Sequence, residues 1–519
     1  MTTRPILVTG ATGYIGGRLV PQLLSKGYRV RCLARDPERL RGRDWTGEVE
    51  VVAGDVLDRG SLGPALAGCG AAYYLVHSMA AGEGSFCERD LRAARNFAAA
   101  AGEAGLDRVI YLGGLGRRSE RLSTHLTSRH EVGDVLRGGP VPATELRAAM
   151  IIGSGSASFE MLRALVKRLP VMVCPRWVSN RTQPIAIGSV LAYLTGCLEQ
   201  PATAGQVLDV GGPDVLTYKE MMERFAAAQG WRRYILVVPV LTPRLSAYWA
   251  NLVTPVPASI AFPIIEGLKS ETVCEDDRIL DLVPVERVGF EEAVAVAMEE
   301  VRSHDVETRW TNASLPGRDR GPAAFAPADF PIFDRQRVDC HAPAGALFDR
   351  VRAVGGEVGW YYSDPLWKIR GWMDRAIGGV GLRRGRRDPV EVFVGDAIDF
   401  WRVEDVVPGE RLLLHAEMRV PGDAWLEFRV RPLDRPGVRS ELVQTAYFRP
   451  MPFWGRLYWN LLYPLHWFVF RGMARGLARA AERTSGAESA ALAAGPLVLA
   501  PRVSASSEYH PSDAGTTGP

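Results

Sequence analysis

Cysteine is scarce in this 519-residue chain, and none of its seven cysteines stands in a C-x-x-C spacing. That excludes a disulfide framework and favours reduced thiols in a cytoplasm. The eight histidines have no partner at metal-ligand spacing, so no metal site is expected. Long apolar runs are also missing, because residues 234–268 are interrupted by prolines and residues 459–470 are too few to span a membrane. We therefore expect a cytoplasmic protein without a metal.

An excess of one charge sign is absent as well. The formal net charge is only +3, which gives no global basic field for a nucleic-acid partner. Apolar residues make up 47% of the chain, enough to bury the cores of two or three domains. The composition therefore favours a multidomain globular protein whose partners are small molecules rather than nucleic acids. Its oligomeric state stays open.

A glycine motif opens the chain, in the sequence LVTGATGYIGGRLV at residues 7–20. Gly10, Gly13 and Gly16 follow an apolar run that is typical of a buried strand, and they precede leucines at helical spacing. A strand, a tight glycine turn and a helix N-terminus form the arrangement that binds a dinucleotide pyrophosphate. The motif therefore predicts a cofactor site that includes Gly10, Thr12, Gly13, Tyr14, Ile15 and Gly16.

The second predicted strand indicates which dinucleotide binds. It ends at Ala34 and Arg35, where an acidic residue would bind the ribose hydroxyl of NAD and an arginine suits the 2′-phosphate of NADP. Arg35 therefore favours NADP(H) over NAD(H), with Arg31 and Arg39 as weaker helpers. The alternative is that Arg35 is a solvated loop residue.

The chain divides into four parts. Residues 1–305 alternate strands and helices, the pattern of a doubly wound α/β parallel sheet, or Rossmann fold. Residues 306–331 are rich in Pro, Gly and Ala and are predicted to be a linker. Residues 332–484 form a second domain, and residues 485–519 are predicted to be a disordered tail.

The first part resembles the short-chain dehydrogenase/reductase superfamily, in its atypical or extended branch. The resemblance rests on TGATGYIGG (9–17), GDVLD (54–58), YLVHSM (74–79) and ELRAAMIIGSGS (145–156). It implies that Asp55 and Val56 contact the adenine and that Thr12 to Ile15 cover the pyrophosphate. It also implies that His77 and Ser78 lie along the cofactor towards the nicotinamide ribose.

Active members of that superfamily use a serine after the fifth strand and a Tyr-x-x-x-Lys pair on the next helix. Here Gly113 and Gly114 stand at the serine position, and His125 and Arg129 stand at the tyrosine and lysine positions. Either His125 replaces the tyrosine as proton donor, with an imidazole that titrates near neutrality and Arg129 holding the ribose, or both are ordinary polar helix residues. The standard catalytic set is missing.

The second domain has a different pattern. Val390–Tyr447 contains short segments rich in β-formers, among them VEVFVG and AIDFWRVEDV, separated by turn sequences. Alternation places Leu426, Phe428 and Val430 on one face of a strand. A long helix follows from about Phe453 to Glu482, and its apolar positions recur at helical spacing: Leu457, Leu461, Leu465, Phe468, Met473 and Leu477.

This order resembles an α+β helix-grip fold of the SRPBCC/START-like superfamily, whose members bind hydrophobic ligands. More narrowly, GWYYSDPLWKIRGWMDRAIGGVGLRRGRRDP (359–389) and FRPMPFWGRLYWNLLYPLHWFVFRGM (448–473) are similar to the DUF2867 domain, which is fused behind a reductase-like domain in bacterial proteins. The resemblance implies an apolar cavity for a small molecule or lipid. Candidate lining residues, each of which could instead be core, are Trp360, Tyr361, Trp367, Trp372, Trp401 and Trp425.

Two basic features have open interpretations. The cluster Arg383, Arg384, Arg386 and Arg387 is either a phosphate or lipid-headgroup site or a solvated loop. Arg471, Arg475, Arg479 and Arg483 form a stripe on the last helix, which either lies on the inner face of a membrane or is half-exposed.

The leading functional hypothesis is an NADPH-dependent oxidoreductase that acts on a bulky apolar substrate. The alternative is a non-catalytic NADP(H)-binding sensor, assembly factor or accessory subunit of a membrane-associated complex. Sugar-nucleotide epimerisation ranks third because it depends on the same absent tyrosine.

Overall fold

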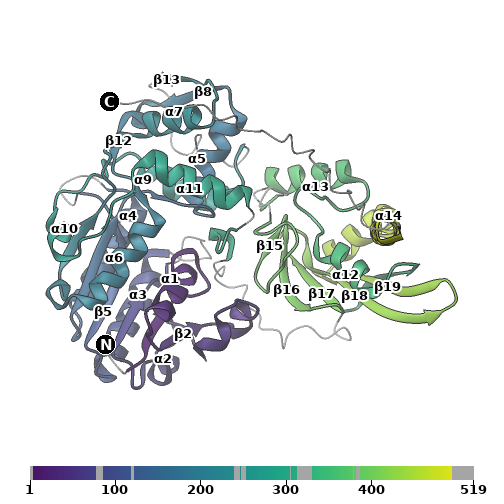
Figure 1. Cartoon of the computed structure of the whole chain (residues 1–519), viewed down its shortest axis with the longest axis horizontal. Coiled ribbons are helices and arrows are strands. Elements are labelled where there is room, and N and C mark those ends of the chain that lie inside the picture. Colours follow the sequence, from purple (N-terminus) through teal and green to yellow (C-terminus); the bar gives the residue numbers. More distant parts are fainter. Residues whose placement is uncertain are drawn as a thin grey trace, which may run out of the picture.

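A computed structural model describes residues 4–77, 86–117, 122–238, 246, 250, 253–303, 305–312, 330–377, 379–381 and 386–493 (Figure 1). Ser78, Arg383 and Arg384 lie outside the described residues. So does the predicted tail beyond residue 493.

The N-terminal part is built on a seven-stranded sheet in the order β11-β6-β5-β4-β1-β2-β3, and all its pairs are parallel. This confirms the predicted Rossmann architecture. Its strands are β1 (Ile6–Thr9), β2 (Val30–Ala34), β3 (Glu50–Ala53), β4 (Ala71–Tyr74), β5 (Arg108–Gly114), β6 (Ala143–Ala148) and β11 (Val207–Val210).

Helices cover both faces of this sheet, because each face buries its own apolar cluster. One face is covered by α1 (Tyr14–Ser25) and α6 (Ile187–Glu199). The other is covered by α2 (Arg59–Leu66), α3 (Phe86–Glu103) and α4 (Thr124–Arg137) (Figure 1). The carboxyl ends of β1, β4 and β5 therefore meet the glycine turn at one edge of the sheet.

A smaller layer packs beyond that edge and has its own apolar core. Its helices are α5 (Ala157–Arg168), α7 (Tyr218–Ala228), α9 (Ala258–Gly267) and α11 (Phe290–Arg302), whereas α10 (Arg278–Leu282) packs on the core of the parallel sheet through Ile279. Its strand pairs are β7 (Ile151–Ile152) with β10 (Ile185–Ala186), β8 (Val171–Pro175) with β13 (Tyr234–Val238), and β9 (Arg181–Thr182) with β12 (Leu216–Thr217).

The C-terminal part is a six-stranded antiparallel sheet in the order β14-β19-β18-β17-β16-β15. Its strands are β14 (Ile332–Cys340), β15 (Ala397–Ile398), β16 (Trp401–Val407), β17 (Arg411–Ala416), β18 (Gly422–Arg435) and β19 (Val438–Pro450). Its helices are α12 (Ala344–Arg352), α13 (Asp364–Ala376) and α14 (Trp454–Ala493). The apolar positions predicted on β18 are confirmed, because Leu426, Phe428 and Val430 are all buried, but Glu427 between them is buried too.

Three sequence expectations about this part are wrong. Residues 390–395 form no strand, because the Asp388 carboxylate accepts the backbone N–H groups of Val390 and Glu391, both at 2.7 Å, and Asp396 accepts that of Phe393. The last helix continues to Ala493, into the predicted tail. Only the later apolar positions of that helix are core: Met473 and Leu477 are buried, whereas Leu457, Leu461, Leu465 and Phe468 are exposed.

The start of the predicted linker is also packed rather than free. The Thr308 hydroxyl donates to the Tyr14 carbonyl at 2.8 Å and accepts from Arg18 Nε at 3.1 Å. Thr311 and Asn312 are buried within a short 3-10 helix, Trp310–Asn312. Residues 306–312 therefore belong to the folded N-terminal part, because their polar groups are bonded to α1. Residues 313–329 lie outside the described residues.

Candidate functional site

The glycine turn has the geometry that a pyrophosphate needs. Gly10 has a φ of +75°, and a Cβ built on it would lie 2.8 Å from the Leu75 carbonyl oxygen. A Cβ on Gly16 would lie 2.4 Å from the Gly10 carbonyl oxygen, so only glycine lets α1 pack this close to the turn. No side chain caps the N-terminus of α1, and its first turn carries no acid. The turn therefore fits an anionic group at its free N–H donors.

The arginines near the second strand fall into different environments. Arg35 follows the end of β2 and is exposed, as a 2′-phosphate contact requires. Arg31 points elsewhere, because its guanidinium binds Glu50 at 2.7 Å and the Ala65 and Ala67 carbonyls. The helper role expected for Arg31 is therefore wrong. Arg39 donates to the Asn312 carbonyl at 3.1 Å.

The predicted adenine contacts lie on the loop after β3. The Asp55 carboxylate accepts from Leu57 N–H at 2.9 Å, and the Ser61 hydroxyl donates to the Asp55 carbonyl. The side-chain amide of Asn96 donates to the carbonyls of Val56 and Leu57. These bonds hold the loop in one conformation beside β1 and β2. The adenine contact itself stays a prediction.

An apolar cavity of about 770 Å³ extends from the glycine turn. Tyr14, Ile15, His77, His125 and Arg129 line the end at the turn, so the structure brings these predicted site residues together. The rest of the lining is mostly apolar and comes from α5, β8 and α9, with Met161, Leu162, Leu165, Val171, Val173, Ile264 and Leu268. A cofactor on the turn would thus face a space suited to a large apolar molecule.

A chain of hydrogen bonds ends at this cavity. The Asp90 Oδ2 atom lies 3.0 Å from His77 Nδ1, and His77 Nε2 lies 3.2 Å from His125 Nδ1. If the carboxylate of Asp90 accepts a proton from His77 Nδ1, then His77 Nε2 accepts the Nδ1–H of His125. This leaves Nε2 as the His125 ring nitrogen available to the cavity. Asp90 was missed from the sequence because its contact with His77 is made only when α3 packs beside β4.

Both histidines are biased towards the neutral form. Burial lowers the pKa of His125 well below its usual value, and the neighbouring His77 and Arg129 lower it further. Burial also lowers the pKa of His77, although its hydrogen bond to Asp90 opposes this. The expectation that His125 titrates near neutrality therefore needs correction. A protonated His125 is a stronger acid than free imidazole, and it is populated at lower pH.

At the usual serine position the side chains of Leu126 and Glu145 lie close to the two glycines. A Cβ on Gly114 would lie 2.8 Å from Leu126 Cδ2, and one on Gly113 would lie 3.1 Å from Glu145 Oε1. Arg129 is held in place because it donates to the Leu112 carbonyl and lies over the Tyr111 ring. The Tyr14 hydroxyl is buried and has no hydrogen-bond partner among the described residues. Tyr14 is thus a second candidate proton donor besides His125. From the sequence it was expected only as part of the cofactor turn.

The aromatic residues expected to line a cavity in the C-terminal domain mostly form its core. Trp360, Trp367 and Trp401 are buried and pack in one cluster, with Trp360 and Trp367 ring centroids 5.1 Å apart. Trp372 is 66% exposed. Ligand binding by this domain stays a prediction, because the cavity described above lies in the N-terminal domain.

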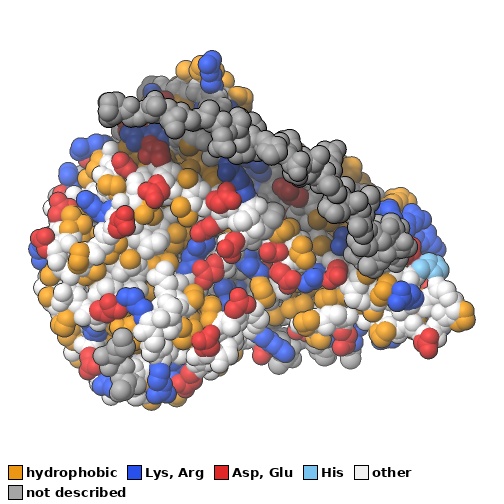
Figure 2. Space-filling model, viewed as in Figure 1, with side chains coloured by type: hydrophobic (Ala, Val, Ile, Leu, Met, Phe, Trp, Pro, Cys, Tyr) orange, Lys and Arg blue, Asp and Glu red, His pale blue; other side chains and the backbone are white. Residues whose placement is uncertain are grey.

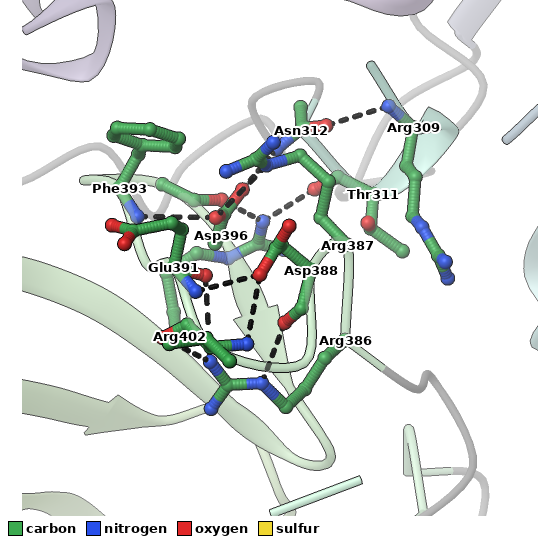
Figure 3. Close-up of polar contacts among 12 residues, drawn as sticks. Arg309, Thr311, Asn312, Arg386, Arg387, Asp388, Glu391, Phe393, Asp396 and Arg402 are labelled. Atoms are coloured by element: carbon green, nitrogen blue, oxygen red, sulfur yellow. Dashed lines mark hydrogen bonds and ion pairs between the residues drawn. The ribbon is translucent and has the colours of Figure 1, made fainter. Parts of the chain in front are cut away.

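The two domains meet at a cluster of polar contacts (Figure 3). The buried Asp396 accepts from the Asn312 side-chain amide at 2.8 Å and from Arg387 Nε at 3.3 Å. Arg402 donates to the carbonyls of Thr311 and Gly395. Figure 2 shows acidic and basic side chains interspersed between the two domains on the visible face. Arg386 and Arg387 belong to the basic cluster that was expected to be either a phosphate or lipid-headgroup site or a solvated loop. Both are instead structural, since Arg387 binds Asp396 and Arg386 donates to the carbonyls of Val354 and Asp388.

Two family models match the chain. Residues 10–149 match a family described as NAD(P)H-binding, and residues 326–473 match DUF2867, described as a protein of unknown function. The chain joins an NAD(P)H-binding Rossmann domain to a DUF2867 domain. The chain is similar to proteins that are named as reductases.

Ceramide reductase of Caulobacter vibrioides is 29% identical over 243 residues, which cover 45% of this chain and 73% of that protein. The chloroplastic divinyl chlorophyllide a 8-vinyl-reductase of Oryza sativa subsp. indica is 26% identical over 250 residues, 45% of this chain and 61% of that protein. Among solved structures, triphenylmethane reductase of Citrobacter sp. complexed with NADP(H) is 21% identical, with a TM-score of 0.47, and covers 56% of this chain and 99% of that chain.

Proposed function

We propose that this protein is an NADPH-dependent oxidoreductase that reduces a bulky apolar substrate in the cavity of its N-terminal domain. The observation that carries the proposal is the continuity of this cavity. It begins at the glycine turn, passes His125 and extends between apolar side chains of α5, β8 and α9. The ceramide reductase relative supports a lipid-like substrate, because a long apolar molecule fits such a lining.

The chemistry divides between cofactor and protein. A bound nicotinamide would supply a hydride, and protonated His125 would supply the accompanying proton from Nε2. Asp90 stabilises the protonated state of His125 through His77, since each link is within hydrogen-bond distance. Arg129 would hold the ribose end of the cofactor. The apolar lining keeps water from the reacting atoms.

The preference for NADPH over NADH is part of the proposal, and the exposed Arg35 at the end of β2 supports it. Calorimetric titration should show tighter binding of NADPH. Arg35→Asp should weaken NADPH binding by about tenfold to a hundredfold, because one charge-assisted contact is lost, and should leave NADH binding nearly unchanged. Arg41→Asp is the matched control, since Arg41 is paired with Glu38 on the surface. Equal NADPH and NADH affinities in the unmodified protein would refute the role of Arg35.

Turnover is tested by NADPH oxidation with long-chain aldehydes, ketones, enones and quinones. His125→Phe should lower kcat by about 10²–10⁴ and leave NADPH affinity nearly unchanged, because a general acid acts only in the chemical step. The rate of the unmodified protein should fall as pH rises through a value below the usual imidazole pKa, since burial lowers the pKa of His125. Tyr14→Phe tests the rival donor: a loss confined to that variant would move the proton source to Tyr14.

A second candidate function is a non-catalytic NADP(H) sensor, assembly factor or accessory subunit. The glycines at 113 and 114, which leave the serine position without a hydroxyl, favour it. If NADPH raises the Tm of the protein and no compound in the panel is reduced, this alternative is favoured. Epimerisation of a sugar nucleotide ranks third, because the cavity lining is largely apolar.

For the C-terminal domain we propose a helix-grip fold of the SRPBCC/START-like kind. Its support is the antiparallel sheet with the second half of α14 packed on it, where Met473, Ala474 and Leu477 are fully buried. Binding of an apolar small molecule or lipid by this domain belongs to the same proposal.

A further inference from the structure

The first half of α14 exposes large apolar side chains instead of packing them. Trp454 is 67% exposed and Leu461 is 75% exposed. The segment before and along this half-helix adds further exposed apolar residues: Met451, Phe453, Leu457, Tyr463, Leu465, Trp467 and Phe468. Isolated exposed apolar residues are ordinary, but a contiguous group of this size marks a binding surface.

Helix α13 extends this surface. It exposes Ile369, Trp372, Met373 and Ile377. The two helices are neighbours, because the Trp367 ring on α13 lies 6.3 Å from the Phe470 ring on α14. Figure 1 shows both on the C-terminal domain, with α14 at the end remote from the parallel sheet. We call the exposed apolar residues of α13 and of segment 451–468 the aromatic face.

The charges on this surface have one sign. Between Arg449 and Ala481 the sequence contains five arginines and no aspartate or glutamate. The Arg471 guanidinium lies over the Trp467 ring at 4.9 Å, so charge and aromatic area are combined. Helix α13 adds the exposed Lys368. Its Arg370 is paired with the buried Asp374 at 3.9 Å, and Asp364 accepts the Trp360 N–H at 2.9 Å.

We propose that the aromatic face binds the surface of an anionic membrane. Tryptophan and tyrosine rings favour the boundary between headgroups and acyl chains, and arginines bind the anionic headgroups. Among the described residues no helix is long and apolar enough to cross a membrane, so the contact is with the surface. A second copy fits less well, because a two-fold contact would bring two acid-free, arginine-bearing surfaces together.

The cavity supports the same partner. Val171 and Val173 line it and are each more than half exposed, so they lie at its opening. The paired strand β13 exposes Tyr234 and Leu236 beside them. An apolar substrate dissolved in a bilayer could enter the cavity through this apolar rim. That last step rests on the proposed reductase function, whereas the membrane contact does not.

The test is flotation of the full chain with phosphatidylcholine vesicles that contain either no anionic lipid or about 30% phosphatidylglycerol. The anionic lipid gives the vesicle a negative surface potential. Binding should require the anionic lipid and weaken with added salt. Trp454→Glu/Leu461→Glu should reduce the bound fraction at least tenfold. The control Val215→Glu/Val296→Glu adds the same charge at two exposed apolar sites elsewhere and should bind like the unmodified protein.

Three results would overturn the proposal: no binding to anionic vesicles, equal loss in both double variants, or conversion of a dimer to a monomer by the first variant without any vesicle binding. Calorimetric NADPH titration of the variants separates these outcomes from unfolding. Failure of the reductase assay leaves the vesicle result unaffected, so the two proposals fail independently.

Discussion

At the scale of single residues, burial decides how the ionisable groups behave. The buried Asp90 and the partly buried His77 and His125 form a chain of contacts, and Asp399 shows the same effect in the C-terminal domain. Burial raises the pKa of Asp399 to about 6, although its carboxylate accepts a hydrogen bond from Trp360 Nε1 at 2.9 Å. The charged form of Asp399 is therefore a cost in the folded state at neutral pH.

We expect Asp399→Asn to raise the free energy of unfolding at pH 7 by roughly 2–3 kcal/mol. The folded pKa lies above the unfolded value, so the contribution of Asp399 is fully present below about pH 4 and is lost as pH rises through about 6. An asparagine still accepts from Trp360 and tolerates the positive φ of this position, +53°. Urea unfolding at several pH values checks this. A stability gain of equal size at pH 4 and pH 7 would contradict it.

At the scale of elements, close approach between backbones positions the site. Helix α1 packs against the glycine turn with no room for a side chain at Gly16, and α4 packs against β5 with little room at Gly114. The first contact builds the cofactor turn, and the second fills the place of the usual serine with the side chain of Leu126.

We expect Gly16→Ala to abolish measurable NADPH binding and to lower stability by about 1–3 kcal/mol, because the new Cβ would overlap the Gly10 carbonyl. Gly188→Ala is the matched control on α6, where a Cβ meets nothing within 4 Å. That control should be neutral or stabilising by about 1 kcal/mol, since alanine has the higher helix propensity. Calorimetric titration and thermal unfolding measure both. Retained NADPH affinity in Gly16→Ala would place the cofactor elsewhere.

At the scale of the whole molecule, the domain interface lies against the loop that carries the predicted NADP contacts. Arg39 donates to Asn312, Asn312 donates to Asp396, and a Cβ on Gly42 would lie 2.7 Å from the Phe393 ring. The C-terminal domain thus supports the region after β2, and the packed residues 308–312 connect it to α1. The predicted NADP contacts and the contacts between the domains therefore share this region.

Asp396→Ala should release the C-terminal domain and lower stability by about 3 kcal/mol or more, because Arg387 and Asn312 lose a buried acceptor. Asp434→Ala, at an exposed position near the end of β18, should change stability by less than about 0.5 kcal/mol. Unfolding curves and trypsin cleavage near Arg387 measure the two effects. Unchanged cleavage in Asp396→Ala would mean that other contacts hold the interface.

The sequence alone determined the features that are local in the chain. Backbone sterics and side-chain periodicity within one segment gave the glycine turn and the positions of the first five strands along the chain. They also gave the end of β2 next to Arg35 and the apolar positions of β18. His125 and Arg129 were placed on one helix face for the same reason. Tertiary structure decided everything that joins distant segments: the Asp90–His77–His125 chain, the cavity, the Asn312–Asp396 contact and the exposure of half of α14. Periodicity shows that a helix has an apolar face, but only the neighbouring elements determine whether that face is covered.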